Sequence, residues 1–353
     1  MVAQSGVAAD ASSALTRPMR YADLPGGRRI SRIGLGTWQF GSREWGYGDA
    51  YADRASRDIV RRARELDITL FDTAEVYGFG RSERILGEAL GHERGDVVVA
   101  SKVFPVAPFP PVIRQRWEGS AKRLGVSRIP LYQVHQPHPL VPDSVIMPGL
   151  RSLLDDDRIG AAGVSNYSLD RWQAADTALG RPVVSNQVQF SLAHAAPLDD
   201  LVPFAERENR LVIAYSPLAQ GLLGGRYTVG HRPGGVRAVN PLFGTENLHR
   251  VQPLLDLLRE VADAHQARPA QIALAWLIGL PRVVVIPGAS GVAQLEHNAA
   301  AAAIGLRADE QAALTSAARA FTPVSAARTA VDGLRDLATG WLSAARGGSR
   351  PPQ

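Results

Sequence analysis

The sequence predicts an α/β fold, a single (β/α)8 TIM barrel with an N-terminal β-hairpin and additional helices at the C-terminus. Short apolar runs rich in β-branched residues alternate with segments of helical periodicity, eight times between residues 33 and 303. No linker rich in Pro, Gly and Ser interrupts this alternation. The length of 353 residues and the hydrophobic content of 45% suffice for one large core. A closed barrel therefore fits the sequence better than a doubly wound sheet with a second domain.

The first elements expected are a hairpin and the eight strands of the barrel. The hairpin turns at Pro25, Gly26 and Gly27, because Pro and Gly favour the backbone angles of tight turns. Each later run is short and apolar, as expected for strands of a parallel sheet that is buried on both faces. The strands are expected at residues 33–35, 68–71, 97–100, 130–134, 161–164, 183–188, 211–214 and 283–286.

Helices are expected between consecutive strands, where apolar residues recur every three or four positions. They span residues 54–66, 82–90, 111–124, 144–155, 169–179, 198–209, 251–265 with 269–280, and 292–303. Two further helices, at 309–320 and near 325–345, are expected to pack outside the barrel. The stretch 220–247 lacks such a pattern, and a loop of this length in a compact domain is usually functional or disordered.

The chain is thus divided into a disordered N-terminal tail at 1–17, a barrel at 18–322, and a C-terminal helix and tail at 323–353. The first seventeen residues lack the basic start and apolar stretch of a signal peptide. No apolar run reaches the length of about 18 residues that a membrane helix needs. The absence of cysteine excludes disulfides, thiol nucleophiles and cysteine-based zinc sites. We expect a cytoplasmic protein without a membrane partner.

The basic residues give a net charge of +5, but they are scattered among Asp and Glu rather than clustered. This pattern favours a solvated, mildly basic surface over a nucleic-acid interface. Only Lys102 and Lys122 among the 39 basic residues are lysines. A chain with so strong a preference for arginine is expected to retain lysine where arginine would not serve.

Polar residues follow the apolar runs of the second, third and fourth strands. Asp72, Lys102 and His135 stand at the ends of these runs, and Tyr77 follows Asp72 by five residues in a Gly-flanked loop. Taken singly, they read as a turn-forming acid, a packed ring, a solvated charge and a core histidine. In a (β/α)8 barrel, however, the carboxyl ends of the strands meet at one mouth, where active sites lie. We therefore expect the four side chains to lie together.

As a group, the four residues make a coherent acid catalyst. A phenol has a reference pKa near 10, and a buried ammonium beside it lowers that pKa toward the range useful for general acid catalysis. Asp72 is expected to be the counter-ion of Lys102, because an unpaired buried charge is costly. A neutral His135 can donate a hydrogen bond to a substrate oxygen. The set predicts protonation of a carbonyl oxygen while hydride reaches the carbon.

From about residue 31 to residue 303, the sequence resembles the aldo-keto reductases. Eight motifs in register carry the resemblance: GLGTW (34–38), FDTAEVYG (71–78), ASK (100–102), LYQVHQP (131–137), GVSNYS (163–168), NQVQFSL (186–192), AYSPLAQGLL (214–223) and IPGAS (286–290). The resemblance implies a barrel that reduces a small carbonyl substrate with a nicotinamide cofactor. It also implies that Tyr77 is the general acid/base, that Asp72 and Lys102 tune it, and that His135 orients the carbonyl.

The resemblance further implies a cofactor site at the barrel mouth. The nicotinamide amide would be held by Ser165, Asn166 and Gln187, with Tyr215 stacked on the ring. The pyrophosphate would be lined by Ser216, Leu218 and Gly221, and the adenosine end by Gln294 and Asn298. The other residues expected at the cofactor are Gly36, Thr37, Trp38, Asp72, Pro217, Arg226, Pro287, Gly288, Ala289 and Ser290. A dinucleotide-fold fingerprint G-x-G-x-x-G is not met, because Gln39 stands at the position of the third glycine.

The sequence departs from the family pattern at the expected adenosine end. Some members carry Lys and Arg that bind the 2′-phosphate of NADP, where this chain has Gly288 and Gln294, and His297 stands where members commonly carry Glu. Backbone N–H groups near Ser290 could still hold an anion. Arg226 is a second candidate phosphate ligand, although it reads equally well as a surface arginine. We expect NADPH and keep NADH as the alternative.

The substrate pocket is expected to contain His135 and aromatic residues near the mouth. Trp38, Trp45, Tyr47 and Phe79 could enclose an apolar or sugar-like carbonyl, although all but Trp38 read equally as packing residues. No metal site is expected: His138 follows His135 by three residues, but Pro137 breaks helical spacing and no third ligand is near.

Three functional hypotheses follow. The first is an NADPH-dependent carbonyl reductase for aldehydes or ketones. The second is a barrel that binds the cofactor but serves as a regulatory subunit, against which the intact set of four residues argues. The third is a sugar- or vitamin-aldehyde reductase of a biosynthetic pathway, whose selectivity the long stretch 220–247 would enforce.

Overall fold

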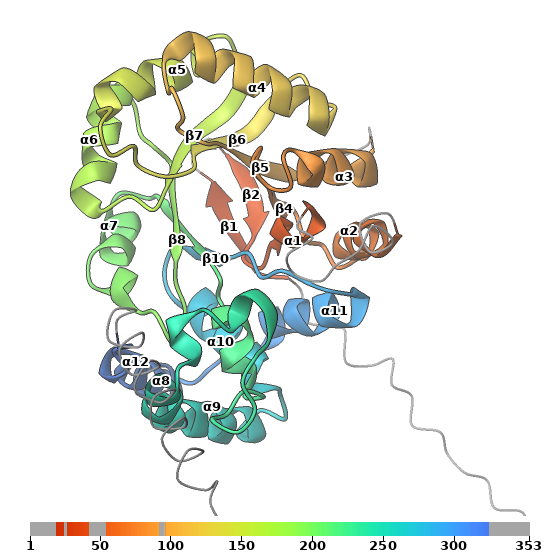
Figure 1. Cartoon of the computed structure of the whole chain (residues 1–353), viewed down its shortest axis with the longest axis vertical. Coiled ribbons are helices and arrows are strands. Elements are labelled where there is room, and N and C mark those ends of the chain that lie inside the picture. The colour runs from red at the N-terminus through yellow and green to blue at the C-terminus, as the bar shows by residue number, and fades with distance from the viewer. Residues whose placement is uncertain (1–18, 25–26, 42–53, 92–94, 96, 325–353) are drawn as a thin grey trace, which may run out of the picture.

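The predicted hairpin and barrel are both present in the computed structural model, which describes residues 19–24, 27–41, 54–91, 95 and 97–324 (Figure 1). Strands β1 (Tyr21–Leu24) and β2 (Arg28–Ser31) pair antiparallel as the N-terminal hairpin. Leu24 and Ile30 of the hairpin are buried in one cluster with Leu70 and Val98, which begin two of the barrel strands. The hairpin therefore fills the end of the barrel opposite the mouth.

The eight barrel strands are parallel and lie in sequence order. They are β3 (Leu35–Gly36), β4 (Leu70–Asp72), β5 (Val98–Val103), β6 (Ile129–Val134), β7 (Ile159–Ser165), β8 (Ser185–Gln189), β9 (Leu211–Tyr215) and β10 (Val283–Val285). A parallel bridge between Ile33 and Val285 joins the first strand to the last, and Gly34 N–H donates to the Val285 carbonyl at 2.7 Å. This bridge closes the barrel.

Helices surround the strands (Figure 1). Their apolar side chains are buried in one cluster with those of the strands. Ile146, Leu150 and Leu153 of α5, spaced four and three residues apart, are all fully buried. The helices are α1 (Trp38–Gly41), α2 (Ser56–Glu65), α3 (Arg81–Leu90), α4 (Pro110–Leu124), α5 (Asp143–Asp155), α6 (Leu169–Leu179), α7 (Leu201–Arg207), α8 (Thr245–Arg250), α9 (Gln252–Ala264), α10 (Pro269–Gly279), α11 (Val292–Ala300) and α12 (Ala308–Ala320).

Two segments differ from the sequence-based expectation. The helix expected at 198–209 is shorter, because a 3-10 turn at Ala196–Leu198 precedes it and the Asp200 carboxylate caps the Leu201 N–H at 2.6 Å, where α7 begins. The stretch 220–247 is not structureless. It contains 3-10 turns at Gly235–Arg237 and Pro241–Phe243 and the first turn of α8.

Several expectations concern residues outside the described part of the chain. These are the N-terminal tail at 1–17, the turn residues Pro25 and Gly26 of the hairpin, the helix near 325–345, and the aromatic residues Trp45 and Tyr47. Among the helices that the structure does describe, none combines the length and apolar character required to cross a membrane.

Candidate active site

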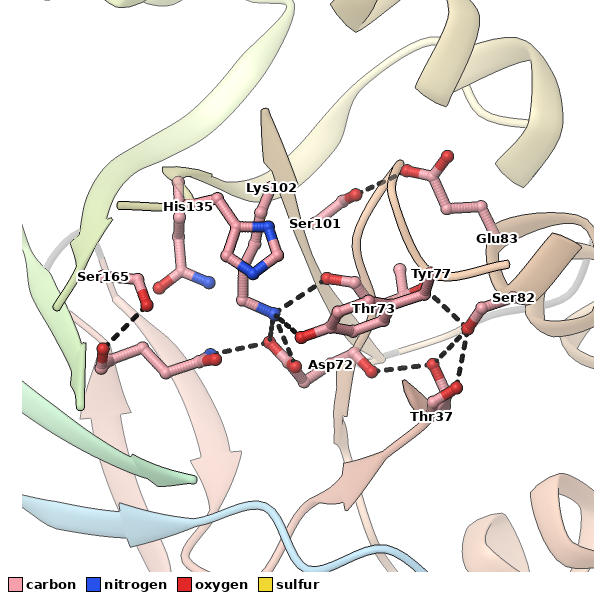
Figure 2. A network of polar contacts seen from close by, with 12 residues as sticks. Thr37, Asp72, Thr73, Tyr77, Ser82, Glu83, Ser101, Lys102, His135 and Ser165 are labelled. Atoms are coloured by element: carbon pink, nitrogen blue, oxygen red, sulfur yellow. Dashed lines mark hydrogen bonds and ion pairs between the residues drawn. The ribbon is translucent and has the colours of Figure 1, made fainter. Parts of the chain in front are cut away.

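Four side chains at the ends of three adjacent strands and in the loop after one of them meet at the carboxyl end of the barrel, as the strand-end pattern predicts (Figure 2). Asp72 ends β4, Lys102 lies near the end of β5, and His135 directly follows β6. Tyr77 lies in the loop after β4. Its hydroxyl is 3.2 Å from Lys102 Nζ, and its ring centroid is 5.7 Å from that of His135. The four residues therefore form one cluster.

Lys102 is the centre of this cluster and is fully buried. Its ammonium donates to Asp72 Oδ1 and Oδ2 at 2.7 and 2.8 Å, and to the Thr73 carbonyl at 3.0 Å. The Gln187 amide also donates to Asp72 Oδ2, at 2.7 Å. Burial lowers the pKa of Lys102, but Asp72 and Tyr77 raise it above its ordinary value, so the amine is charged at neutral pH.

The prediction that the pKa of Tyr77 is lowered overall is wrong, because burial outweighs the effect of Lys102. Burial raises the pKa of Tyr77, the Lys102 ammonium lowers it, and the Asp72 charge raises it again. The net pKa lies above the ordinary value of 10, although the expected effect of Lys102 is present. The phenol is therefore protonated at neutral pH, which is the state that can donate a proton.

His135 is a neutral imidazole in this environment. Burial, and then the nearby Lys102 ammonium, lower its pKa to about 3. Its ring packs edge-on against Tyr77 and, at 5.7 Å between centroids, against Phe104. Within the described residues, the buried Nδ1 has no hydrogen-bond partner. A neutral ring at this position agrees with the expected hydrogen-bond donor for a substrate oxygen.

The cluster lies at one side of a pocket of about 530 Å³. Most of the residues expected at the cofactor line this pocket: Gly36, Trp38, Asp72, Ser165, Asn166, Gln187, Tyr215, Ser216, Pro217, Leu218, Gly221, Arg226, Pro287, Gly288, Ala289, Ser290 and Gln294. Tyr77 and His135 line it as well. The pocket is thus formed by the loops that follow the strands around the barrel.

Beside the cluster, three polar side chains hold one another at the pocket wall. Asn166 Nδ2 donates to Ser165 Oγ at 3.1 Å, and the Tyr215 hydroxyl donates to Asn166 Oδ1 at 2.9 Å. Ser165 Oγ in turn donates to the Gln187 carbonyl at 2.8 Å. Asn166 has a φ of 61°, a left-handed conformation that asparagine adopts more readily than most residues. This wall offers amide and hydroxyl groups together with the half-buried Tyr215 ring.

At the far end of the pocket, the donors near Ser290 that are expected to hold an anion lie next to Gln294. The Ser290 N–H and hydroxyl both donate to Gln294 Oε1, at 2.8 and 2.7 Å, so a neighbouring side chain already occupies these donors. Arg226 lines the pocket, and its guanidinium lies 5.1 Å from the centroid of the Tyr227 ring. Arg226 therefore places a positive charge at this end of the pocket.

Other expected residues lie outside the pocket lining. Phe79 was expected in the substrate pocket, but it is 95% exposed, because Gly78, Phe79 and Gly80 form a left-handed turn (φ of 54°, 53° and 82°) that directs the ring to solvent. The Thr37 hydroxyl donates to the Asp72 carbonyl at 2.8 Å and supports the site from behind. Asn298 is buried and donates to the Gly288 carbonyl at 3.3 Å.

Several residues that line the pocket are not among those predicted from the sequence. Phe104 could have been found from strand alternation, because it lies two residues after Lys102, and Gln136 directly follows His135. Arg237 carries no local signal, since it belongs to the long stretch after β9. His138, which resembled half of a metal pair, accepts the Leu140 and Val141 N–H groups in a turn. The missed pocket residues are Gln39, Val76, Phe104, Gln136, Gln220, Arg237 and Ile286.

Comparisons with known proteins agree with this architecture. An uncharacterized oxidoreductase of Mycobacterium tuberculosis is 70% identical over 318 residues, covering 90% of this chain and 98% of that protein. The NADH-specific methylglyoxal reductase of Escherichia coli is 31% identical over 301 residues, covering 78% and 91%. The structure of glycerol dehydrogenase from Gluconobacter oxydans superposes with a TM-score of 0.78 at 28% identity, covering 86% and 97%.

A second solved structure, an aldo-keto reductase from Klebsiella pneumoniae in complex with NADPH, superposes with a TM-score of 0.69 at 27% identity, covering 88% of this chain and 97% of that one. A sequence model of the Aldo/keto reductase family matches residues 32–319. The match includes every strand of the barrel and all four residues of the cluster. The chain therefore belongs to the aldo/keto reductase family of oxidoreductases.

Proposed function

We propose that this aldo/keto reductase is an NADPH-dependent carbonyl reductase that converts an aldehyde or ketone to an alcohol, with Tyr77 as the proton donor. The observation that carries the proposal is the hydrogen bond of 3.2 Å between the buried Lys102 ammonium and the Tyr77 hydroxyl at the wall of a large pocket. A protonated phenol beside a fixed cation can release its proton when negative charge develops on a nearby oxygen.

The roles of the four residues follow from their contacts. Tyr77 donates its proton to the carbonyl oxygen, so that an O–H bond forms as the phenol O–H bond breaks. Lys102 stabilises the resulting phenolate, because its ammonium lies within hydrogen-bond distance. Asp72 holds Lys102 as an ammonium through the buried ion pair. His135 stays neutral, with a pKa of about 3, and donates a hydrogen bond that orients the carbonyl.

The residues that line the pocket suit a nicotinamide dinucleotide. When bound, the reduced cofactor supplies the hydride. Ser165, Asn166 and Gln187 would bind its carboxamide, because they present donors and acceptors beside Tyr77, and the Tyr215 ring would stack on the nicotinamide. The loops after β9 and β10 would hold the phosphates and the adenosine end. Their pocket residues are Ser216, Leu218, Gly221, Arg226, Pro287, Gly288, Ala289, Ser290 and Gln294.

We propose NADPH rather than NADH because two arginines, Arg226 and Arg237, line this pocket. A guanidinium matches the geometry and charge of a phosphate, which is what distinguishes the two cofactors. The Klebsiella pneumoniae relative was solved with NADPH, whereas the Escherichia coli relative is an NADH-specific reductase, so NADH is the alternative that the experiment must test.

The substrate end of the pocket favours an uncharged carbonyl compound. Beside Tyr77 and His135, the lining includes the large apolar side chains of Trp38, Val76 and Phe104, together with the uncharged Gln136. These side chains offer apolar area, and a carboxylate or phosphate buried against them would lose its hydration without a partner. The identity of the substrate, including a dedicated sugar or vitamin aldehyde, is left to a screen of carbonyl compounds.

The decisive experiment combines cofactor titration with a turnover assay. NADPH and NADH are titrated against the purified protein by tryptophan fluorescence, and aldehydes and ketones are then screened for loss of reduced-nicotinamide absorbance. We expect Tyr77→Phe to lower kcat by at least about 100-fold while cofactor affinity stays within about twofold, because general acids contribute factors of this size. Failure of both cofactors to bind would refute the proposal. Binding without turnover by the wild type would instead favour a regulatory subunit.

A further inference from the structure

Glu75 lies between Asp72 and Tyr77 in the loop after β4, yet it does not line the pocket. Its backbone N–H donates to the Lys102 carbonyl at 3.3 Å. Its carboxylate Oε1 accepts the backbone N–H of Phe104. Glu75 thus joins the Tyr77 loop to strand β5 at Lys102 and to Phe104, the residue that directly follows this strand.

Arg116 of helix α4 completes these contacts. Its Nε donates to Glu75 Oε2 at 3.0 Å, and another guanidinium nitrogen lies 2.9 Å from Glu75 Oε1. The same arginine donates to the Val106 carbonyl at 3.1 Å. The Glu75 side chain is only 8% exposed and that of Arg116 26% exposed. Because both charges are largely removed from water and both carboxylate oxygens are engaged, the geometry of the pair is strongly constrained.

The two contacts of Glu75 hold opposite sides of the catalytic cluster. On the loop side, Tyr77 follows two residues later and places its hydroxyl 3.2 Å from Lys102 Nζ. On the strand side, the Phe104 ring packs edge-on against His135 with 5.7 Å between centroids. We propose that Glu75, held by Arg116, is a positioning residue that fixes the Tyr77 hydroxyl against Lys102 and the Phe104 ring against His135.

This inference rests on the proposed reductase activity for its kinetic consequences. Glu75→Gln keeps an acceptor for the Phe104 N–H but loses the ion pair with Arg116, whereas Glu75→Ala loses both. A displacement of the order of 1 Å in catalytic geometry lowers rates by roughly 100-fold. We therefore expect kcat to fall by about threefold to tenfold in Glu75→Gln and by about 30- to 100-fold in Glu75→Ala. The affinity for NADPH is expected to stay within about twofold.

The pH dependence of kcat distinguishes positioning from a general loss of stability. In the wild type the Lys102 ammonium lowers the pKa of Tyr77, so a phenol that drifts from Lys102 while it stays buried beside Asp72 has a higher pKa. The basic limb of the kcat profile is therefore expected to move to higher pH in Glu75→Ala and by less in Glu75→Gln. Arg116→Met, which keeps the bond from Phe104 to Glu75, is expected to resemble Glu75→Gln.

Asp176 provides a matched control at the opposite end of the barrel. It accepts the Val183 N–H at 2.6 Å and pairs with Arg210 at 3.2 Å, just before strands β8 and β9. Its side chain is 23% exposed and that of Arg210 11% exposed, so this ion pair is comparably buried. Asp176→Asn is expected to lower thermal stability as Glu75→Gln does, while kcat and its basic limb stay unchanged.

Amide hydrogen exchange tests the contact without any turnover. The Phe104 amide is expected to exchange at least about tenfold faster in Glu75→Ala than in the wild type, because it loses its acceptor. If the wild type reduces no carbonyl, the proposed function fails while this measurement still decides the structural claim. An unchanged Phe104 exchange rate refutes the contact. The positioning role is refuted if the basic limb of the kcat profile does not shift in Glu75→Ala and if kcat of this variant falls no more than that of Asp176→Asn.

Discussion

The Lys102 ammonium acts on two different residues through one charge. It lowers the pKa of Tyr77, which burial raises, and it lowers the pKa of His135, which burial lowers as well. The same cation therefore limits the increase in the pKa of Tyr77 and adds to the decrease in the pKa of His135. Both side chains are neutral at physiological pH. The Tyr77 phenol can donate a proton, and the His135 imidazole can donate a hydrogen bond.

His135 makes the stability of the folded protein depend on pH. Its folded pKa, about 3, lies below the ordinary value of 6.5, so below pH 6.5 the unfolded chain binds a proton that the folded chain does not. The stabilisation is complete above pH 6.5 and is lost as the pH falls toward 3. Between pH 7 and pH 5, we expect the wild type to lose about 2 kcal/mol more unfolding free energy than His135→Gln.

Urea unfolding of both proteins at the two pH values measures this difference. His249→Gln, at an exposed position on α8, controls for the loss of a histidine. Equal losses in the wild type and His135→Gln would show that His135 is not held neutral in the folded state.

At the level of elements, the barrel loops carry the unusual backbone conformations of the site. Asn166 follows β7 with a φ of 61°, and Ser216 and Gln220 follow β9 with φ values of 50° and 56°. Non-glycine residues in this region cost about 1 to 3 kcal/mol each and persist only where the surroundings enforce them. These three residues line the pocket, whereas no residue of strands β7 and β9 beneath them has a positive φ. The strands position the loops, and the loops present the ligands.

The segment after β9 is where cofactor choice is expected to be decided. We predict that Arg226→Ala weakens NADPH binding by about 10- to 100-fold and NADH binding by less than about threefold, because a charge-assisted bond to the 2′-phosphate would be lost. Fluorescence titration with both cofactors measures the two affinities.

Arg250→Ala removes the same charge from an exposed position on α8 that does not line the pocket, and it is the control for net charge. Equal weakening of NADPH and NADH in Arg226→Ala would reassign Arg226 to a phosphate that both cofactors share.

At the scale of the whole molecule, the fold places one lysine inside the barrel and the other on its outer surface. The net charge of +5 is carried almost entirely by arginine. Lys102 is enclosed at the barrel mouth with no exposed surface, whereas Lys122 lies exposed on the outer helix α4. A single closed barrel separates an interior amine from an exterior one that has the same chemistry.

Chemical modification can detect this separation. We predict that an amine-reactive acetylating ester modifies Lys122 in the native protein and leaves Lys102 unmodified, because Lys102 is buried and held as an ammonium. After unfolding in urea, both lysines are expected to react. Mass spectrometry of proteolytic peptides measures each site. Native modification of Lys102 would contradict its enclosure by Asp72, Thr73 and Tyr77.

Much of this architecture can be predicted from short-range patterns in the sequence. The alternation of apolar runs and helical patterns predicts the barrel, since strand and helix periodicities are properties of short segments. The four residues of the cluster follow from what stands at the strand ends, because parallel strands of a closed barrel deliver their ends to one mouth. Strand alternation also accounts for the inward direction of Phe104, which lies two residues after Lys102.

The remaining features depend on contacts between distant segments, which no local pattern contains. Burial by surrounding elements raises the net pKa of Tyr77 above 10 despite Lys102, and a left-handed turn directs Phe79 to solvent. Arg237 reaches the pocket only through the path of the stretch after β9. The sequence by itself determined the barrel and its catalytic residue types. Only the tertiary structure decided their charge states and their neighbours, because desolvation and long-range contacts arise when the chain closes on itself.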